Sequence, residues 1–298
     1  MKLHGIFPPL TTPFANDGTV SVAKLRENIA RYNKTRLAGY AINGSTSESV
    51  LLAWDEVYGI WETARDAAAP DKILIAGTGA ESTRETIEHT NRAASLGYTL
   101  AMVRTPSFYK PAMSENALAE HYLRVADAVR IPILVYSVPV FTHVTVEAPL
   151  VARVSKHPNI IGIKDSSGSV EGVASIIAAA PKEFQTLVGS ASTVYESLEK
   201  GAVGAILAVA CAFPELCVNI YEASRAGDKA KANSLAQKLV APAKMLGQYG
   251  VAGLKYVLDR LGYFGGSPRG PLLPVGASAQ AEIDAMLSNL TAQTAHQL

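Results

Sequence analysis

The chain has 298 residues, of which 48% are hydrophobic and 18% charged, a composition typical of compact globular proteins. Its formal net charge of +1 argues against nucleic-acid binding, which needs a clustered basic surface. Cys211 and Cys217 lack the spacing of a zinc site, so we expect two buried thiols in a reducing compartment. Without a signal-peptide pattern or a run of apolar residues long enough to span a membrane, we expect a soluble cytoplasmic protein.

Short apolar runs alternate with amphipathic stretches in chain order. The runs predict strands at residues 5–10, 39–42, 73–76, 100–103, 133–136, 160–163, 186–188 and 204–209. Between them, helical patterns include residues 22–32, 56–68, 82–96, 115–129 and 170–179. Ser21, Ser82 and Ser114 are predicted to cap their helices, and Glu85 follows Ser82 at the spacing of a capping box.

The predicted strands are almost continuously apolar, as a parallel sheet buried on both faces requires. Eight strand-then-helix units favour a closed (β/α)₈ TIM barrel. The alternative is an open, doubly wound sheet, but residues 5–14 lack the glycine-rich turn that such folds often carry. Four further helical patterns follow at residues 214–226, 229–247, 251–261 and 277–290. We therefore predict a barrel over residues 1–213 and a C-terminal helical extension over residues 214–298.

Two predicted strands end in residues that carry chemistry, Lys164 and Tyr136. A buried lysine prefers the neutral amine, which attacks carbonyl groups to form Schiff bases. Alternatively, Lys164 could pair with Asp165 in a structural ion pair, and Tyr136 could be an interior tyrosine with a satisfied hydroxyl. Carboxyl ends of barrel strands meet at one face, so the two residues together predict imine chemistry on a small ketone.

The residues that follow the second predicted strand, 44–48, form a turn rich in hydroxyl groups. Ser45 and Thr46 could hold a carboxylate near a helix N-terminus, or the turn could be an ordinary capped turn. The six histidines show no metal-binding spacing, so we expect no metal. His143 could contact a substrate or lie on a surface loop. No phosphate-binding loop is present in the sequence, and we expect no organic cofactor.

The strand ends resemble those of the dihydrodipicolinate synthase and N-acetylneuraminate lyase family of pyruvate-dependent class I aldolases, over residues 5–273. The motifs that carry this resemblance are PPLTTPF at 8–14, GSTSE at 44–48, YSVP at 136–139 and IKD at 163–165. The resemblance implies a barrel with C-terminal helices, no cofactor, pyruvate as substrate and a homotetramer. It makes Lys164 the Schiff-base lysine and Tyr136, relayed through Ser45, the proton-transfer residue. Ser45 and Thr46 would hold the keto-acid carboxylate.

Further site residues follow from the same resemblance. Ser166 and Ile206 are expected substrate contacts, and Tyr109 is the expected relay to a neighbouring subunit. The family places its relay tyrosine where this chain has Phe108, so Tyr109 would act only if the loop shifts by one residue. Ser47 stands where a glycine is common.

Within the family, the sequence is most similar to 4-hydroxy-2-oxoglutarate aldolase, at residues 76–83, 135–139, 157–160 and 262–266. Phe141 stands where dihydrodipicolinate synthases have an arginine for a second carboxylate. We therefore predict aldol cleavage of a 4-hydroxy-2-keto acid to pyruvate and an aldehyde such as glyoxylate. The alternatives are dihydrodipicolinate synthesis, a sugar-acid aldolase or dehydratase, and a non-catalytic keto-acid-binding protein. Retention of both Lys164 and Tyr136 argues against the last.

Overall fold

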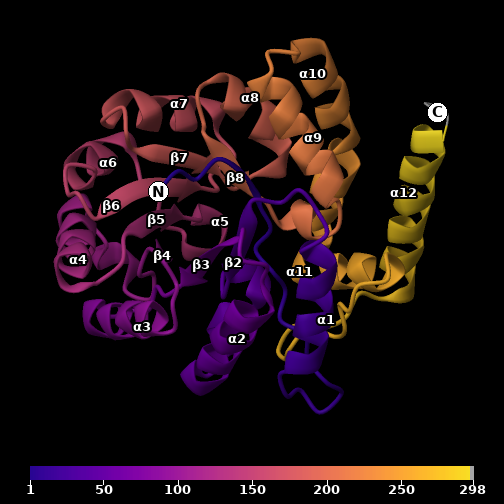
Figure 1. The fold of residues 1–298 in the computed structure, drawn as a ribbon, viewed down its shortest axis with the longest axis horizontal. Helices are drawn as coiled ribbons and strands as arrows, with labels where there is room; N and C mark the ends of the chain where they lie inside the picture. Colours follow the sequence, from indigo (N-terminus) through magenta and orange to yellow (C-terminus); the bar gives the residue numbers. More distant parts are fainter. Residues whose placement is uncertain (296–298) are drawn as a thin grey trace.

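A nearly closed parallel barrel dominates the computed structural model, which describes residues 1–295 and the side chains of residues 1–290 (Figure 1). The strands found there pair in the order β1-β8-β7-β6-β5-β4-β3-β2. Their bounds are β1 Gly5–Phe7, β2 Gly39–Ile42, β3 Ile73–Gly77, β4 Leu100–Arg104, β5 Ile133–Ser137, β6 Ile160–Asp165, β7 Gln185–Val188 and β8 Gly204–Ile206. Between β1 and β2 the Leu10 N–H donates to Ala41 O at 2.9 Å, and the Ala41 N–H donates to Pro8 O at 3.0 Å. The predicted TIM barrel is confirmed.

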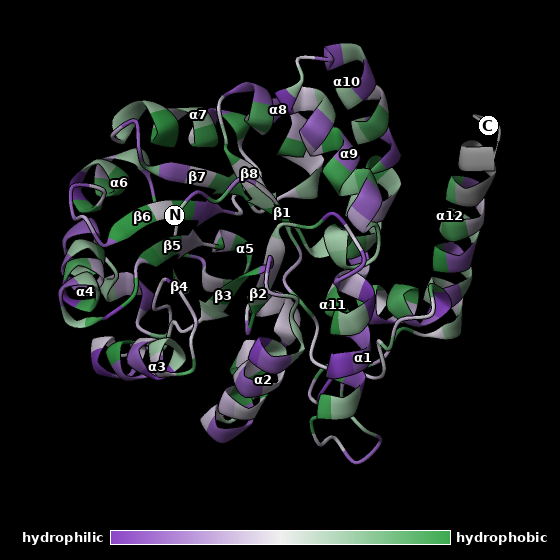
Figure 2. Cartoon of the chain, in the orientation of Figure 1, coloured by the Kyte–Doolittle hydropathy of each residue, from purple (hydrophilic) through white to green (hydrophobic). Residues whose placement is uncertain are grey.

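Helices surround the strands and turn their apolar faces inward (Figures 1 and 2). They are α1 Val22–Tyr32, α2 Trp54–Ala67, α3 Thr83–Ser95, α4 Glu115–Ala128, α5 Pro139–Thr142, α6 Ala148–Val154, α7 Val170–Ala179 and α8 Val194–Glu199. Ser82 and Ser114 cap their helices as predicted, by accepting the N–H of Glu85 and of Ala117. Ser21 occupies the N-cap position of α1 as predicted, but its side chain makes no capping hydrogen bond.

Short 3₁₀ helices follow several strands at the C-terminal end of the barrel. They are η1 Ser45–Ser47, η2 Ser49–Leu51, η3 Lys110–Ala112, η4 Ala191–Thr193 and η5 Ala208–Cys211. Strand β8 is shorter than predicted, since η5 takes over the end of its apolar run. Strand β1 is also shorter than predicted, because Pro8 and Pro9 have no N–H to donate to a ladder.

The C-terminal extension consists of α9 Pro214–Arg225, α10 Lys229–Lys238, α11 Val240–Arg260 and α12 Ala277–Ala295. The predicted barrel boundary at residues 213 and 214 coincides with the start of α9, and residues 296–298 lie outside the described residues. The single helix predicted over 229–247 is wrong. The chain instead ends α10 and starts α11, with Pro242 in the first turn, where a proline costs no hydrogen bond. Gly250, with φ 56° and ψ −145°, kinks α11 near the predicted break.

The extension packs onto the barrel, with α9 against β1 and both α9 and α11 against η5. In Figure 1, α12 stands apart from the barrel at one side of the molecule. Within the described residues, no helix is both long and apolar enough to cross a membrane.

Side chains from the strands fill the barrel interior. A buried cluster there brings together Phe7, Leu134, Tyr136, Leu187 and Ile206 from β1, β5, β7 and β8. Two residues predicted to belong to the site, Tyr136 and Ile206, are thus part of the interior packing. Both residues lie at the C-terminal ends of their strands, so they are close to the mouth of the barrel, where the active sites of such folds are found.

We predict that Gly162→Ala will destabilise the barrel by at least about 2 kcal/mol. A Cβ at Gly162 in β6 would lie 2.2 Å from the backbone O of Gln185, and that backbone atom cannot move without breaking the β6–β7 ladder. The matched control is Gly59→Ala in α2, where a Cβ meets nothing within 4 Å. It should raise the free energy of unfolding by about 0.5–1 kcal/mol. Urea unfolding of the two variants checks both signs, and a Gly162→Ala protein as stable as the parent would contradict the packing.

Candidate functional site

Lys164 and Tyr136 lie side by side at the ends of neighbouring strands. The register of β5 and β6 pairs Tyr136 with Lys164 directly. Both are 3% exposed. The Lys164 Nζ lies 4.0 Å from the centroid of the Tyr136 ring. The contact fixes the Lys164 side chain against the face of the Tyr136 ring.

Asp165, next in the strand, has other partners. Its Oδ2 accepts the hydroxyl of Ser167 at 2.5 Å and the Ser167 N–H at 3.3 Å. Burial raises the pKa of this carboxyl group. Among the described residues, no ion pair involves Lys164. The ion pair with Asp165 that the sequence left open is therefore absent from the described structure.

The hydroxyl of Tyr136 lies 3.0 Å from the Oγ of Ser45, the first residue of η1. Thr46 follows and, like Ser45, is partly buried. Gly44, which precedes η1, has no side chain to cap it, and the hydroxyl of Ser45 contacts Tyr136. The arrangement links a phenol to a hydroxyl-rich turn, which provides a path for a proton and donors for an anion.

Hydrogen bonds anchor η1 to the segment after β1. The Thr12 hydroxyl donates to Ser47 O at 2.7 Å, and the Ser47 hydroxyl donates to Leu10 O at 2.5 Å. Ser47 thus holds η1 in place. The non-glycine residues with positive φ in the described chain are Asn43, Glu48 and His143, which follow β2 and β5. Such strained conformations persist where the surrounding structure fixes them, often at functional sites.

Of the other predicted residues, two lie at strand ends and are at least partly buried, and two lie in exposed loops. Ser166, directly after β6, is partly buried, and Ile206 ends β8 with no exposed surface. Tyr109 is 72% exposed, packs edge-on against Phe108 at 5.1 Å, and shares no hydrogen bond with Tyr136 or Ser45 in the described structure. His143 lies on the surface.

A cavity of about 630 Å³ lies where the loops after β7 and β8 meet α10 and α11. Its lining includes Ser190, Ser192 and Lys244, and Ser190 approaches the loop after β6 through Gly168. Sequence reasoning missed Lys244 because its place depends on how α11 packs over the barrel. Lys244 is exposed, and Glu196 lines the same cavity, which none of the predicted site residues lines.

Sequence reasoning also missed a buried ion pair between Glu48 and Lys255. The one signal was a lysine among the apolar residues Leu254, Val257 and Leu258 of α11.

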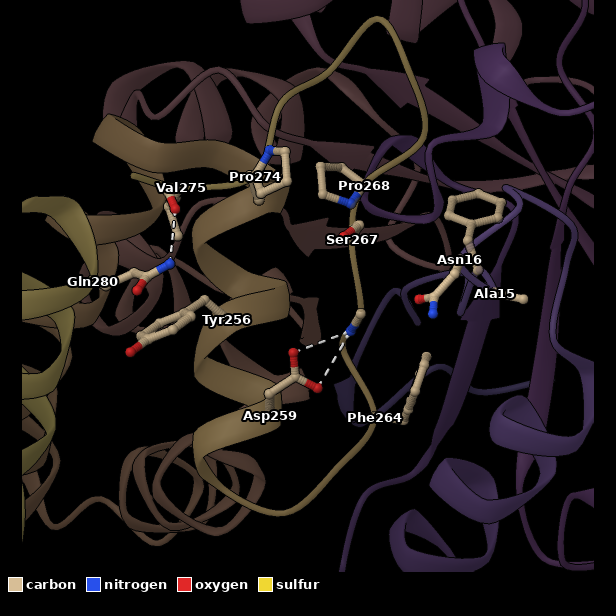
Figure 3. A pocket seen from close by; sticks show the side chains of 13 residues that line it. Ala15, Asn16, Tyr256, Asp259, Phe264, Ser267, Pro268, Pro274, Val275 and Gln280 are labelled. Atoms are coloured by element: carbon tan, nitrogen blue, oxygen red, sulfur yellow. Dashed lines mark hydrogen bonds between the residues drawn. The ribbon is translucent and has the colours of Figure 1, made fainter. Parts of the chain in front are cut away.

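A second cavity, of about 360 Å³, lies between α11 and the segment after β1 (Figure 3). Tyr256, Asp259 and Gln280 line it, and the Asp259 carboxylate already accepts the N–H groups of Gly265 and Gly266. None of the predicted site residues lines this cavity. Over the part of the chain that the structure describes, no group of three or more histidine, cysteine and acidic residues is placed to hold a metal ion.

Lys164 and Tyr136 lie at the strand ends of a (β/α)₈ barrel, where barrel enzymes carry their catalytic residues, and comparison with known proteins gives the family. The model of the dihydrodipicolinate synthetase family matches residues 2–290, and the chain belongs to this family. It is a carbon–carbon lyase of the pyruvate-dependent class I aldolase type.

Relatives carry two activities in their names. The chain is 33% identical to 4-hydroxy-tetrahydrodipicolinate synthase of Methanothrix thermoacetophila, over 97% of each chain. It is 34% identical to a probable mitochondrial 4-hydroxy-2-oxoglutarate aldolase of Emericella nidulans, over 94% of this chain and 92% of the other. Among solved structures, it superposes with a TM-score of 0.92 on a family member from an Escherichia coli K12 prophage in complex with pyruvate. That protein is 29% identical, and the match covers 97% of this chain and 99% of the other.

Proposed function

We propose that this protein cleaves 4-hydroxy-2-oxoglutarate, or a similar 4-hydroxy-2-keto acid, to pyruvate and an aldehyde such as glyoxylate. The observation that carries the proposal is the geometry at the strand ends. An amine without an acidic partner lies over the ring of Tyr136, whose hydroxyl meets Ser45. A nucleophile and a proton-transfer group are thus adjacent, and both are almost fully buried.

The reaction begins when the neutral amine of Lys164 adds to the C2 carbonyl of the keto acid, and uptake of one proton with loss of water gives an iminium. Tyr136, relayed through Ser45, takes the proton of the C4 hydroxyl. The C3–C4 bond then breaks, its electron pair passes into the iminium to form an enamine, and glyoxylate departs. Protonation of the enamine at C3 and hydrolysis by one water release pyruvate and restore Lys164.

The surrounding residues take supporting roles in this proposal. Ser45 and Thr46 hold the C1 carboxylate with η1 backbone donors, Ser166 contacts the substrate from the β6 loop, and Ile206 forms an apolar wall. No metal or organic cofactor enters the scheme.

Assembly as a homotetramer would place a second copy against the exposed loop after β4. Phe108 and Tyr109 are 79% and 72% exposed, and large exposed aromatic side chains are enriched at protein interfaces. In such an assembly Tyr109 of one copy would extend the proton relay of the other.

The choice of substrate rests on the distal end of the site. Phe141, on α5, is 68% exposed and offers no cation. Lys244 and the hydroxyls of Ser190 and Ser192 line the cavity beside the β7 and β8 loops, together with the carboxylate of Glu196. In this proposal the Lys244 ammonium and the two hydroxyls bind a short distal carboxylate. Dihydrodipicolinate synthesis is the second candidate, favoured by the similarity to the Methanothrix synthase.

We predict that borohydride in the presence of pyruvate will attach one reduced three-carbon unit to Lys164. Lys164→Arg should abolish both the adduct and turnover, because a guanidinium does not form an imine at neutral pH. Peptide mass mapping of the reduced protein locates the adduct. An adduct on a different lysine, with turnover intact in Lys164→Arg, would remove Lys164 from the mechanism.

Tyr136→Phe keeps the ring that packs in the barrel interior and removes only the hydroxyl. We expect the rate of cleavage to fall by about 10²–10⁴-fold, the usual contribution of a general acid–base group. Trapping of pyruvate at Lys164 should slow less than cleavage does, because the lysine and its ring contact remain. Steady-state cleavage and single-turnover trapping measure the two steps. Near-normal cleavage would show that another group moves the proton.

Substrate preference distinguishes the two candidate activities. We expect pyruvate-dependent turnover with glyoxylate or 4-hydroxy-2-oxoglutarate to exceed that with aspartate semialdehyde by at least about 10- to 150-fold. The reason is that Phe141 offers no cation to the charged end of aspartate semialdehyde, and a charge-assisted hydrogen bond contributes an effect of about this size. Side-by-side kinetics on the purified protein measure it. Faster condensation with aspartate semialdehyde would establish the synthase activity and leave the imine mechanism intact.

A variant of Lys244 tests the distal contact within the same assay. Lys244→Met should lower kcat/KM by about 10-fold or more for 4-hydroxy-2-oxoglutarate, since it removes a charged donor. The loss should be smaller for 4-hydroxy-2-oxobutyrate, which lacks the distal carboxylate. Equal losses for the two substrates would place Lys244 outside the binding site.

A further inference from the structure

A buried ion pair joins the C-terminal extension to the loop that carries Ser45. The Nζ of Lys255, in α11, lies 2.6 Å from Oε1 of Glu48, the residue directly after η1. The side chains are 0% and 1% exposed. A surface salt bridge contributes little, but a pair this deep is sensitive to the loss of either partner.

The remaining polar atoms of the pair have partners in the extension. The Lys255 ammonium donates to Ser267 O at 3.0 Å and lies 4.3 Å from the centroid of the Phe14 ring. Oε2 of Glu48 accepts the backbone N–H of Arg269 at 2.7 Å. Burial lowers the pKa of Lys255, and the nearby Glu48 carboxylate opposes that shift. Three contacts from one extension therefore converge on the side chain of Glu48 and its counterion.

This arrangement is costly for stability alone. Desolvating two charges offsets much of their attraction, and apolar side chains of similar size often stabilise a core as well or better. Glu48 also has a left-handed backbone conformation, with φ 59° and ψ 35°, which costs a non-glycine residue about 1 kcal/mol or more. Glu48, the residue directly after η1, carries both the cost of burying its charge and the cost of its backbone conformation. This points to a role for Glu48 in placing η1.

The contacts of η1 show what the pair completes. Thr12 and Ser47 hold one side of η1 to the segment after β1. Glu48 holds its end to α11 and to the segment around Arg269. Between the two anchors lies Ser45, whose Oγ is 3.0 Å from the Tyr136 hydroxyl. A shift of η1 by about 1 Å would break that contact, and catalytic geometry is sensitive to displacements of this size.

We propose that Glu48 and Lys255 are positioning residues, which fix η1 so that Ser45 and Thr46 meet the keto-acid carboxylate and Ser45 meets Tyr136. The C-terminal extension thereby forms part of the active-site architecture. The inference rests on the proposed function, because it assigns η1 the carboxylate of the same substrate.

The test uses the double variant Glu48→Gln/Lys255→Met in the full-length protein. Removing both charges avoids leaving one buried ion unpaired, and glutamine keeps an acceptor for the Arg269 N–H. The matched control is Arg269→Met. The guanidinium of Arg269 belongs to the same extension and pairs with Glu56 at 2.6 Å, but its loss leaves the Glu48–Lys255 pair and the backbone N–H in place.

Two measurements are made on the parent, the double variant and the control, all under conditions where they are folded. The first is the pyruvate concentration that gives half-maximal borohydride trapping at Lys164. We expect it to rise at least about 10-fold in the double variant, or about 1.4 kcal/mol of lost binding, and less than about 2-fold in the control. The second is hydrogen exchange of the peptide covering residues 44–49 without substrate. We expect faster exchange in the double variant only.

The inference is overturned if trapping and exchange in the double variant match the parent, or if Arg269→Met shifts both as much as the double variant does. The latter result would indicate general loosening of the extension. Hydrogen exchange on the free protein needs no imine chemistry. A parent protein that pyruvate does not label would therefore contradict the proposed function, while the exchange data would still test the placement of η1.

Discussion

The register between β5 and β6 is the constraint on which the site depends. It pairs Tyr136 with Lys164, Leu134 with Gly162 and Ser137 with Asp165. A slip of one residue would turn Lys164 out of the barrel interior and bring Asp165 in, because side chains alternate across a strand. Gly162 allows close approach to β7 at this point, since a Cβ there would collide with the backbone of Gln185. The register that packs the barrel therefore also places the amine of Lys164 in its interior.

Ser45, whose hydroxyl meets Tyr136, reaches the site from a different part of the chain, on a turn held from two sides. The β1 segment contributes Thr12, and the extension contributes Lys255. Barrel enzymes place their chemistry on loops at the strand ends, and loops of this kind need support from a rigid frame. In this protein the frame includes helices that follow the barrel in sequence. The same helices also supply Lys244 to the cavity beside the β7 and β8 loops.

Much of the fold could be predicted because parallel strands buried on both faces produce long apolar runs. All eight predicted runs overlap an observed strand, and Tyr136 and Lys164 lie one residue before the ends of β5 and β6. Two strands end earlier than their apolar runs predict. Pro8 and Pro9 have no N–H for the ladder of β1, and η5 replaces the end of the β8 run. The partners of Glu48 and the place of Lys244 could not be predicted, because they depend on how α11 packs and leave almost no local pattern.

The central claim is that the amine of Lys164 forms an imine with a keto acid held by η1. A crystal structure of the protein grown with pyruvate tests it most directly. The account predicts continuous density from the Lys164 Nζ to C2 of pyruvate, with the carboxylate within hydrogen-bonding distance of Ser45 and Thr46 and the Tyr136 hydroxyl still close to Ser45. Pyruvate bound elsewhere, or bound in the barrel mouth with Lys164 unmodified, would contradict it.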